Sequence, residues 1–519
     1  MKKGVITVFL ACAMALLLAF EMVVLESART AGLRYLERQA GEAAAEGLLA
    51  GYNRPLFDTF GLLFYEGGCG QAVLNTEAME AAFRSIYEEN RTPGPSLVGG
   101  SLFSLTTAAV TLTEVTAAPD YSGAVLIENA LAYYPYEAAG SVLAMILEQL
   151  GLIEKGEAFR DDVETVENTE AFRDPAAGEP AAEAMAFSHV PQRGIPLLLR
   201  EEDTGAESEV PDYDRERYDE AVENSPIGSA ETVKAGGWLN LVIPSGKAIS
   251  AITFDTALFP SEISVDDRPP QGDTLVNPVK KALFNEYVLS MFSDYLGKKR
   301  AGGSAYEVEY ILFGHSSERD NLSACLNRIM WIREAMNIAF LYSDAGKRET
   351  ALAAAEVIAG WSGLPWLVAV TQAALIASWA YAEALLDTRT LLEGKRVPLL
   401  HNSGTWTLSL EGVTHFFSGG AVEKADTAGG MSYRDYLRVL LYCGNLSTTA
   451  YRTMDMIQYH FLPSNPYFRM ANAVQSVSVR TTAVTTPLFS ALPVVSAFLS
   501  RSGGSVYLIT DTYSADYGG

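Results

Sequence analysis

The first fifty residues, MKKGVITVFLACAMALLLAFEMVVLESARTAGLRYLERQAGEAAAEGLLA (1–50), decide the architecture that the sequence predicts. Residues 5–20 contain no charge, and Glu21 alone interrupts the apolar pattern before Leu25. An α-helix needs about 20 predominantly apolar residues to cross the hydrocarbon core of a bilayer. We therefore predict that residues 5–25 contact membrane lipid and tether the rest of the chain.

Three kinds of N-terminal segment have this appearance. The first is an uncleaved anchor, and the second is a pilin-type leader, in which a short basic stub ending in Gly4 is removed before Val5. Phe9 stands where many pilins carry a glutamate, which departs from the pilin pattern. The third is a secretory signal peptide, which requires a small-residue cleavage site that is not evident after the apolar run. Gly4 and Val5 are thus the candidate processing site, and the three alternatives stay open.

Basic residues flank the apolar run on both sides, and they are Lys2, Lys3, Arg29, Arg34 and Arg38. Because the positive-inside rule depends on an asymmetry between such flanks, it does not decide the orientation. The segment before the apolar run is very short. On that ground we expect a single-pass cell-membrane protein with the bulk of the chain outside the cytoplasm.

The composition predicts a folded, acidic protein. The chain has 519 residues, of which 49% are hydrophobic. A chain of this length and composition supports the cores of roughly two to four domains. The net charge is −25, and this disfavours a nucleic-acid partner because phosphate binding requires clustered Lys and Arg.

The periodicity of apolar residues predicts an α+β fold. Its parts are a long N-terminal transmembrane and stalk helix, followed by a mixed head with an antiparallel sheet and a helical bundle. The helical period continues to residue 50, and Pro55 then interrupts it. We divide the chain into an anchor and stalk, a first α+β region, an acidic linker or long loop, a strand-rich region, a helical bundle and a C-terminal α+β region that completes the sheet. Their bounds are 1–50, 51–154, 155–225, 226–315, 316–400 and 401–519.

The first region contains a predicted helix at 76–89, a strand at 102–116, and two helices within 121–150 that are divided near Pro135. The linker is dense in Asp and Glu and poor in aromatic residues, so it cannot bury enough apolar surface to fold alone.

The strand-rich region is predicted from two patterns. Residues 237–244 end at a proline and form a hairpin with 249–254, and within 305–313 two glutamates alternate with Tyr306, Val308 and Tyr310. In such a strand Glu307 and Glu309 lie on one face. We interpret them as a solvated or ion-paired face rather than a catalytic acid and base, with partners such as Arg319 and Arg333.

The bundle begins with a helix at 318–343, followed by 347–360. Residues 364–382 are nearly free of charge and are either a buried bundle helix or a second membrane span, and the charges of Glu383 and Asp387 favour the first. Ser432 is expected to cap a helix that bends near Gly444. The remaining elements are a helix at 279–296 and strands at 405–410, 474–486 and 506–510.

Motifs for catalysis or metal binding were not found. The sequence lacks GxSxG, HExxH, the phosphate-binding loop and GxGxxG. The five histidines are scattered, so a zinc site would have to be assembled by the fold, and the acidic linker lacks the regular calcium-binding loop. Cys69 and Cys443 form either a disulfide or isolated buried thiols. We predict no cofactor and no enzymatic activity.

Several segments resemble an uncharacterised family of membrane-anchored surface proteins from clostridia-type Gram-positive bacteria. The segments are 306–314 (YEVEYILFG), 320–322 (DNL), 333–337 (REAMN), 4–10 (GVITVFL), 239–244 (LNLVIP), 379–383 (WAYAE), 397–399 (VPL) and 433–437 (YRDYL). Members of this family are similar to the accessory pseudopilins of Tad-type pilus loci, and the ITVF leader at 6–9 is similar to theirs. The resemblance implies a location in the envelope and an association with pilus or secretion proteins, and it carries no catalytic residue.

The sequence thus favours a non-enzymatic envelope protein, an accessory component of a pilus-like or secretion assembly. The alternative is a surface carbohydrate-binding adhesin or hydrolase whose site only the fold would assemble.

Overall fold

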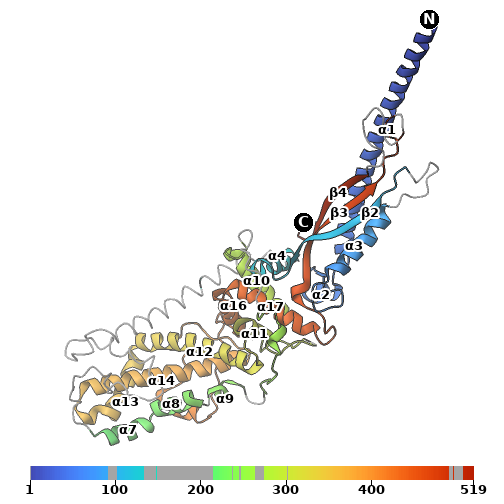
Figure 1. The fold of residues 1–519 in the computed structure, drawn as a ribbon. Coiled ribbons are helices and arrows are strands. Elements are labelled where there is room, and N and C mark those ends of the chain that lie inside the picture. Colours follow the sequence, from blue (N-terminus) through green and yellow to red (C-terminus); the bar gives the residue numbers. More distant parts are fainter. Residues whose placement is uncertain are drawn as a thin grey trace, which may run out of the picture. The chain divides into compact units, whose positions relative to one another are not determined.

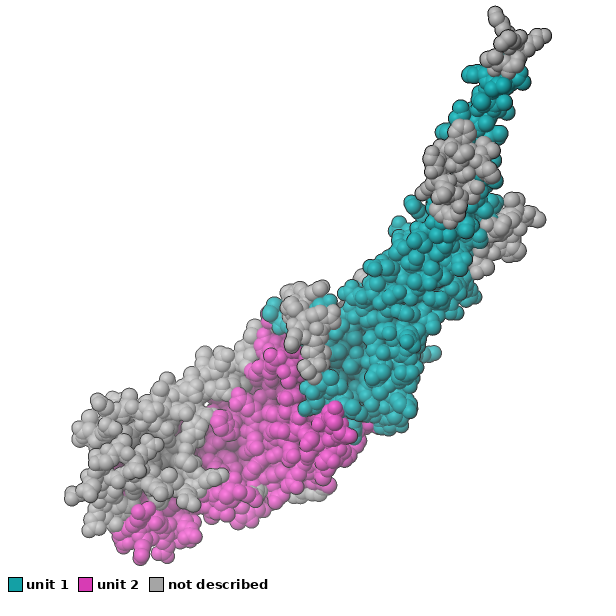
Figure 2. Space-filling view, viewed as in Figure 1, with its two compact units in different colours: residues 1–135, 258–277, 453–519 teal, residues 136–257, 278–452 magenta. Residues whose placement is uncertain are grey.

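The computed structural model describes residues 2–91, 102–133, 148, 214–236, 238–244, 247–263, 274–300, 302–489, 492, 495 and 506–518. The chain folds into two compact units, each built from separate segments (Figures 1 and 2). Unit 1 comprises residues 1–135, 258–277 and 453–519, and unit 2 comprises residues 136–257 and 278–452. This grouping differs from the six consecutive regions expected from the sequence, because unit 1 combines residues from both ends of the chain.

Helix α1 (Lys2–Leu49) covers the segment predicted as anchor and stalk in one uninterrupted element. It contains no proline, and its second half is rich in alanine, which loses little entropy in a helix. Asn53 then caps α2 (Arg54–Phe60), since its side chain accepts a hydrogen bond from the backbone N–H of Leu56 at 3.1 Å. Pro55 lies in the first turn of α2, where its missing N–H leaves no intrahelical bond unmade.

The sheet of unit 1 is antiparallel and has four strands (Figure 1). The strands are β1 (Tyr65–Glu66), β2 (Thr106–Ala117), β3 (Ala473–Thr485) and β4 (Tyr507–Asp516). Strand β3 lies in the centre, with β2 along one edge and β1 and β4 along successive parts of the other. The predictions of strands at 102–116, 474–486 and 506–510 are confirmed.

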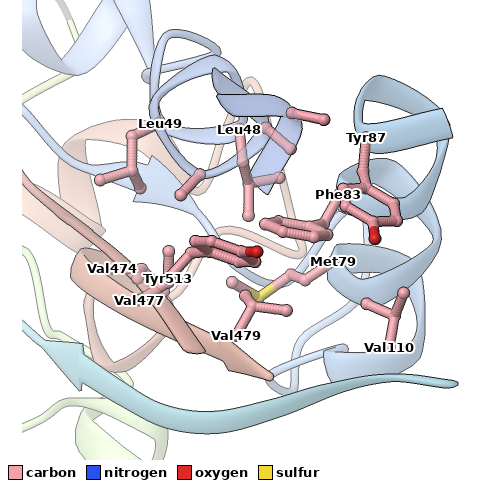
Figure 3. Close-up of a cluster of buried hydrophobic side chains, with 13 residues drawn as sticks. Leu48, Leu49, Met79, Phe83, Tyr87, Val110, Val474, Val477, Val479 and Tyr513 are labelled. Carbon is pink, nitrogen blue, oxygen red and sulfur yellow. The ribbon is translucent and has the colours of Figure 1, made fainter. Parts of the chain in front are cut away.

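Helices α1 and α3 (Thr76–Arg91) pack on one face of this sheet. Figure 3 shows the apolar core that these two helices form with the strands. Residues on the buried side of β3 alternate with half-exposed ones, as a strand with one covered face requires. The core consists of Ala40, Ala44, Ala45, Leu48, Leu49, Met79, Phe83, Tyr87, Val110, Val474, Val477, Val479 and Tyr513. Unit 1 also contains α4 (Ala124–Tyr133), the first of the two helices predicted within 121–150; the second lies outside the described residues, apart from residue 148.

Unit 2 is helical in its described part. Its helices are α7 (Arg215–Glu223), α8 (Pro226–Gly236), α9 (Trp238–Val242), α10 (Pro278–Met291), α11 (Glu307–Phe313), α12 (Glu318–Ser343), α13 (Ala345–Ala359), α14 (Pro365–Leu392), α15 (Leu410–Phe417) and α16 (Tyr433–Cys443). Helix α14 is central, and it packs against α8, α9, α12, α13 and α15. Of the most apolar window of α14, 72% is buried, so the bundle-helix alternative describes it correctly.

Three strand predictions in unit 2 are wrong. Most of residues 237–244 form α9 and most of residues 305–313 form α11, while residues 405–410 are irregular and lead into α15. Both α9 and α11 are short, and α11 is buried on most of its sides, so the helical period of its apolar residues is not visible in so few positions. The expected hairpin is absent among the described residues here; Thr253 instead forms a single bridge with Ser317.

The predicted acidic linker also needs correction at its C-terminal end. Residues 155–213 lie outside the described residues. Residues 215–223 form α7, whose Tyr218 and Val222 belong to the core of unit 2. At the other end of the unit, Ser432 caps α16 with a capping box, and α16 and α17 (Leu446–Phe461) meet at Gly444, as the predicted bend requires.

Candidate functional site

The apolar half of α1 is largely exposed in its described part, where Ala19 is buried. Only 6% of its most apolar window is buried, and Phe9 and Phe20 are among the most exposed large hydrophobic residues. A soluble surface would not sustain such an uninterrupted apolar helix, whereas lipid solvates it without cost. A long apolar helix near the N-terminus therefore supports a membrane anchor or a signal sequence, as the sequence predicted. Gly4 and Val5 lie in the first turns of this helix, and cleavage between them stays a prediction.

The transition from exposed to packed helix is marked by a buried ion pair, Glu26 and Arg29, which we call the clamp. The Nη1 atom of Arg29 lies 2.9 Å from Oε1 of Glu26, and Nη2 donates to the hydroxyl of Thr485 at 2.8 Å. The other carboxylate oxygen of Glu26 accepts the backbone N–H groups of Leu488 and Phe489 at 2.9 and 2.6 Å. Both charges are thus paired and hydrogen-bonded, which is the condition for burying them.

Beyond the clamp, α1 presents a stripe of small and polar side chains to the sheet. The carboxylate of Glu37 accepts hydrogen bonds from the hydroxyls of Tyr87 and Thr481. Desolvation by burial raises the pKa of Glu37, and the Thr481 bond only partly opposes this effect. Gly41 lies against the ring of Tyr513, in the space that a Cβ atom would need.

The predicted charge cluster in unit 2 is divided by the fold. Glu307 accepts from the backbone N–H and the hydroxyl of Ser293 at 2.8 and 3.0 Å. Glu309 accepts from the hydroxyl of Tyr433 at 2.6 Å and from the N–H of Tyr295 at 2.9 Å. Neither carboxylate meets Arg319, which is exposed, or Arg333. The predicted ion pairs between these groups are therefore wrong, because in the helix both glutamates are directed toward buried backbone N–H and hydroxyl donors.

Glu309 is the most perturbed of these acids. Desolvation by burial raises its pKa to about 8, although the hydrogen bond from Tyr433 lowers it and the charge of Asp294 raises it further. Its Oε2 atom has no hydrogen-bond partner among the described residues. A protonated carboxyl fits this environment, since the donors from Tyr433 and Tyr295 both reach Oε1.

Arg333 belongs to a different cluster, which we call the charge network. It joins α12 and α14 to the segment after α14, and its members are Arg333, Glu383, Asp387, His401 and Lys424. The guanidinium Nη2 of Arg333 lies 2.7 Å from Oδ2 of Asp387, and Nη1 donates to the carbonyls of Pro398 and Leu399 at 2.7 and 2.8 Å.

Lys424 completes the network. Its ammonium lies 2.5 Å from Oε1 of Glu383 and 2.6 Å from Oδ1 of Asp387, and Glu383 also accepts the N–H groups of Thr407 and Leu408 at 3.0 and 2.8 Å. Burial alone would raise the pKa of Asp387, but the charges of Arg333 and Lys424 outweigh it and hold that pKa well below its ordinary value. Two carboxylates thus face two cations, so the network is neutral overall.

Burial lowers the pKa of His401, and the charge and hydrogen bond of Asp387 only partly oppose this. In the neutral tautomer with its proton on Nδ1, Nε2 accepts from Arg333 at 2.8 Å and Nδ1 donates to Thr405 at 3.1 Å, whereas the tautomer with its proton on Nε2 donates to Oδ2 of Asp387 at 3.1 Å. The ring therefore acts as a fixed hydrogen-bonding element within the network.

Glu383, Asp387 and His401 offer ligand atoms that lie within 4.8 Å of one another, as a metal site would require. The ammonium of Lys424, however, already binds both carboxylates, and Arg333 donates to His401 and Asp387. A divalent cation would have to displace a paired, buried lysine and would then face a buried guanidinium. The donor set therefore fits an internal ammonium better than a metal ion.

The sequence contains signals for part of the clamp and part of the network. Glu26 and Arg29 are three residues apart on one helix, and Glu383 and Asp387 are four apart at the end of an apolar helix. Such spacing places both charges on one buried face. Lys424 carried no local signal, because its partners precede it by 37 and 41 residues.

The cysteines form no disulfide with one another, and most of them are not buried. Cys325 is buried, whereas Cys69 and Cys443 are exposed and unbridged. The prediction of isolated thiols is confirmed and that of their burial is wrong for Cys69 and Cys443.

Comparison with known proteins identifies one relationship. Residues 216–485 match a family described as a family of unknown function, DUF5702. No curated protein and no solved structure matches the chain. The matched range runs from α7 to the last residue of β3 and includes the complete charge network, Glu307 and Glu309. Because it covers more than half of the chain, this protein belongs to the family of unknown function DUF5702.

Proposed function

We propose that this chain is a non-enzymatic, membrane-tethered envelope protein whose two units lie outside the cytoplasm, and that it serves as an accessory, pseudopilin-like component of a pilus-like or secretion assembly. The observation that carries the proposal is the division of α1 into an exposed apolar half and a half that packs on the sheet. A helix of this kind transmits the position of its lipid-embedded end to a folded body without an intervening flexible linker.

Two further observations support a non-enzymatic role. The charge network, the densest group of titratable side chains described above, is closed by its own cations, and its donors fit an internal ammonium better than a metal ion. The clamp lies where the apolar run ends, and its charges stabilise the attachment of sheet to helix instead of facing solvent.

The orientation is testable through the native cysteines. In intact cells that express the full chain, a membrane-impermeant maleimide should label Cys69 and Cys443, which are exposed. Buried Cys325 should react only after denaturation. A variant with C69S and C443S is the control and should lose the label. Labelling that appears only after lysis would place the body in the cytoplasm and contradict the proposal.

Membrane tethering is tested by a matched pair of variants. Leu17 is exposed within the apolar half, and Tyr35 is exposed beyond it. L17E places a charge where lipid is expected, at about 3 kcal/mol by insertion scales, so the membrane-bound fraction should fall. Y35E should leave that fraction unchanged, and equal behaviour of the two variants would argue against a membrane-embedded N-terminal half.

The pseudopilin-like part of the proposal is tested by mass spectrometry of the mature N-terminus. A chain that begins at Val5 supports pilin-type processing, and G4L should block it. An intact Met1 in the wild-type protein would remove this part of the proposal while leaving membrane tethering in place.

A further inference from the structure

A cavity of about 220 Å³ lies in unit 2 and is lined by residues of α8, α9, α12 and α14. Figure 1 labels these four helices. Pockets that hold drug-sized ligands measure about 300–1,000 Å³, so this cavity suits a single ring or a group of similar size. Its lining combines aromatic rings with one amide and one ion pair, and these residues are Trp238, Trp331, Tyr381, Asn327, Lys234 and Glu334.

Helix α12 supplies most of one wall. Asn327, Trp331 and Glu334 are spaced by four and three residues, which places them on the same face of the helix. Buried Met330 and Ala335 form the apolar base beside them. Trp331 remains 47% exposed, so its indole offers a large apolar surface to a molecule that enters the cavity.

The polar groups of the cavity form a connected set. The ammonium of Lys234 lies 3.4 Å from Oε1 of Glu334 and 4.5 Å from the centre of the Tyr381 ring. Lys234 supplies only donors, Glu334 supplies only acceptors and Asn327 supplies both. These groups satisfy a ligand with hydroxyls that both donate and accept, while the aromatic rings take up its C–H surface.

Other classes of ligand fit the lining less well. An anion would meet the carboxylate of Glu334, and an organic cation would compete with Lys234, which already lies over Tyr381. A purely apolar ligand would desolvate the ion pair and offer it no hydrogen bond.

We propose that this cavity binds one ring of a neutral saccharide, which stacks its C–H face on Trp331 and hydrogen-bonds to Lys234, Glu334 and Asn327. This binding function goes beyond the proposed membrane role and does not depend on it, because every lining residue belongs to unit 2.

Saturation-transfer NMR tests the proposal. The full-length protein is prepared in a detergent whose head group is not a sugar, and maltotriose and triacetylchitotriose are the probes. For one bound ring we expect a dissociation constant on the order of 1 mM for at least one probe. Saturation should be strongest on the C–H protons of one ring face, which contact the indole.

Trp361 provides the matched control. It also lies in unit 2, but it does not line the cavity. The guanidinium carbon of Arg217 lies 4.7 Å from the centre of its ring, and its indole N–H donates to the carbonyl of Ile358. W331A should raise the dissociation constant by about tenfold or more, whereas W361A should leave it unchanged. E334Q should weaken binding less than W331A, since the amide keeps one acceptor. Circular dichroism of each variant verifies that it is folded.

Three results would overturn the proposal. The first is the absence of transfer to either probe up to about ten times the expected dissociation constant. The second is an equal loss of binding in W331A and W361A. The third is binding of choline with an affinity equal to or tighter than that of the sugars, which would identify an ammonium site. None of these outcomes bears on the cysteine labelling or membrane tests above.

Discussion

The ammonium of Lys424 lies 2.6 Å from Oδ1 of Asp387, and both side chains are almost completely enclosed within unit 2. This pair joins the segment after α14 to the central helix of the unit. The same ammonium also contacts Glu383, so one positive charge partly neutralises two buried carboxylates.

Removing this lysine should be strongly destabilising. K424M leaves one uncompensated negative charge in the interior, which typically costs about 3–5 kcal/mol in the free energy of unfolding. Denaturant unfolding of the purified protein measures the change. R396M is the control, since the pair of Arg396 with Asp426 in the same segment is exposed and should contribute little. Adding E383Q to K424M removes one buried negative charge and should restore part of the lost free energy of unfolding. If the double variant restores none of it, the destabilisation by K424M comes from lost packing and not from the unpaired charge.

The contribution of Glu309 to the stability of unit 2 should fall as the pH rises from about 4.5 to about 8. Burial raises the folded-state pKa of Glu309 to about 8, from the ordinary 4.5. The folded state therefore keeps a proton that the unfolded state loses in this range, and the stability contribution decreases by about 1 kcal/mol per pH unit. E309Q mimics the protonated carboxyl. Its free energy of unfolding should depend less on pH than that of the wild type, and at pH 8 it should be larger. E356Q changes an exposed residue and should follow the wild-type curve. Parallel curves for E309Q and the wild type would contradict a raised pKa.

Two arginines of α1 allow a buried ion pair to be compared with an exposed one. R29L leaves the buried carboxylate of Glu26 without its cation and should destabilise unit 1 by about 3–5 kcal/mol. R38L breaks an exposed pair with Glu42 and should be close to neutral. Limited proteolysis and thermal unfolding of the detergent-solubilised chain measure both effects. If the two variants are equally susceptible to protease and to heat, the clamp does not stabilise unit 1.

The contact of Gly41 with Tyr513 makes a further prediction. A methyl group at residue 41 would collide with the ring of Tyr513, so G41A should destabilise unit 1 by about 1–3 kcal/mol. At Gly346 in α13 the nearest atom to an added Cβ lies 3.4 Å away, and G346A should be neutral or slightly stabilising. Combining G41A with Y513L should relieve part of the strain. A neutral G41A would show that the helix and β4 separate without cost.

Much of the fold was predictable because long elements display their period over many residues. Helix α12 has the bounds that the spacing of its apolar residues predicts, and β3 alternates over thirteen residues. The alternation of Glu307 and Glu309 with apolar residues predicts a strand where α11 forms, because seven residues buried on most sides show no helical period. Gly314, with φ of 69° directly after α11, was the available signal, since a glycine in this conformation commonly ends a helix.

The buried charges were harder to predict than the elements that carry them. In the sequence, Glu383 and Asp387 argue against a membrane span, and acids four residues apart on a buried helix also require buried cations. Lys424 and Arg333 supply those cations, but Lys424 lies in an irregular segment and has no periodicity of its own. Only the tertiary fold brings these residues together. The same holds for Arg29 and Thr485, which are 456 residues apart.

Because the chain is synthesised from its N-terminus, the sheet of unit 1 is completed only near the end of translation. Helix α1 emerges from the ribosome first, whereas β3 and β4 are translated after every helix of unit 2. Until then the buried stripe of α1, with Glu37 and the small residues around Gly41, has no sheet to cover it. A nascent chain must therefore keep this surface shielded during nearly all of its elongation, by lipid, by a chaperone or by transient contacts within itself.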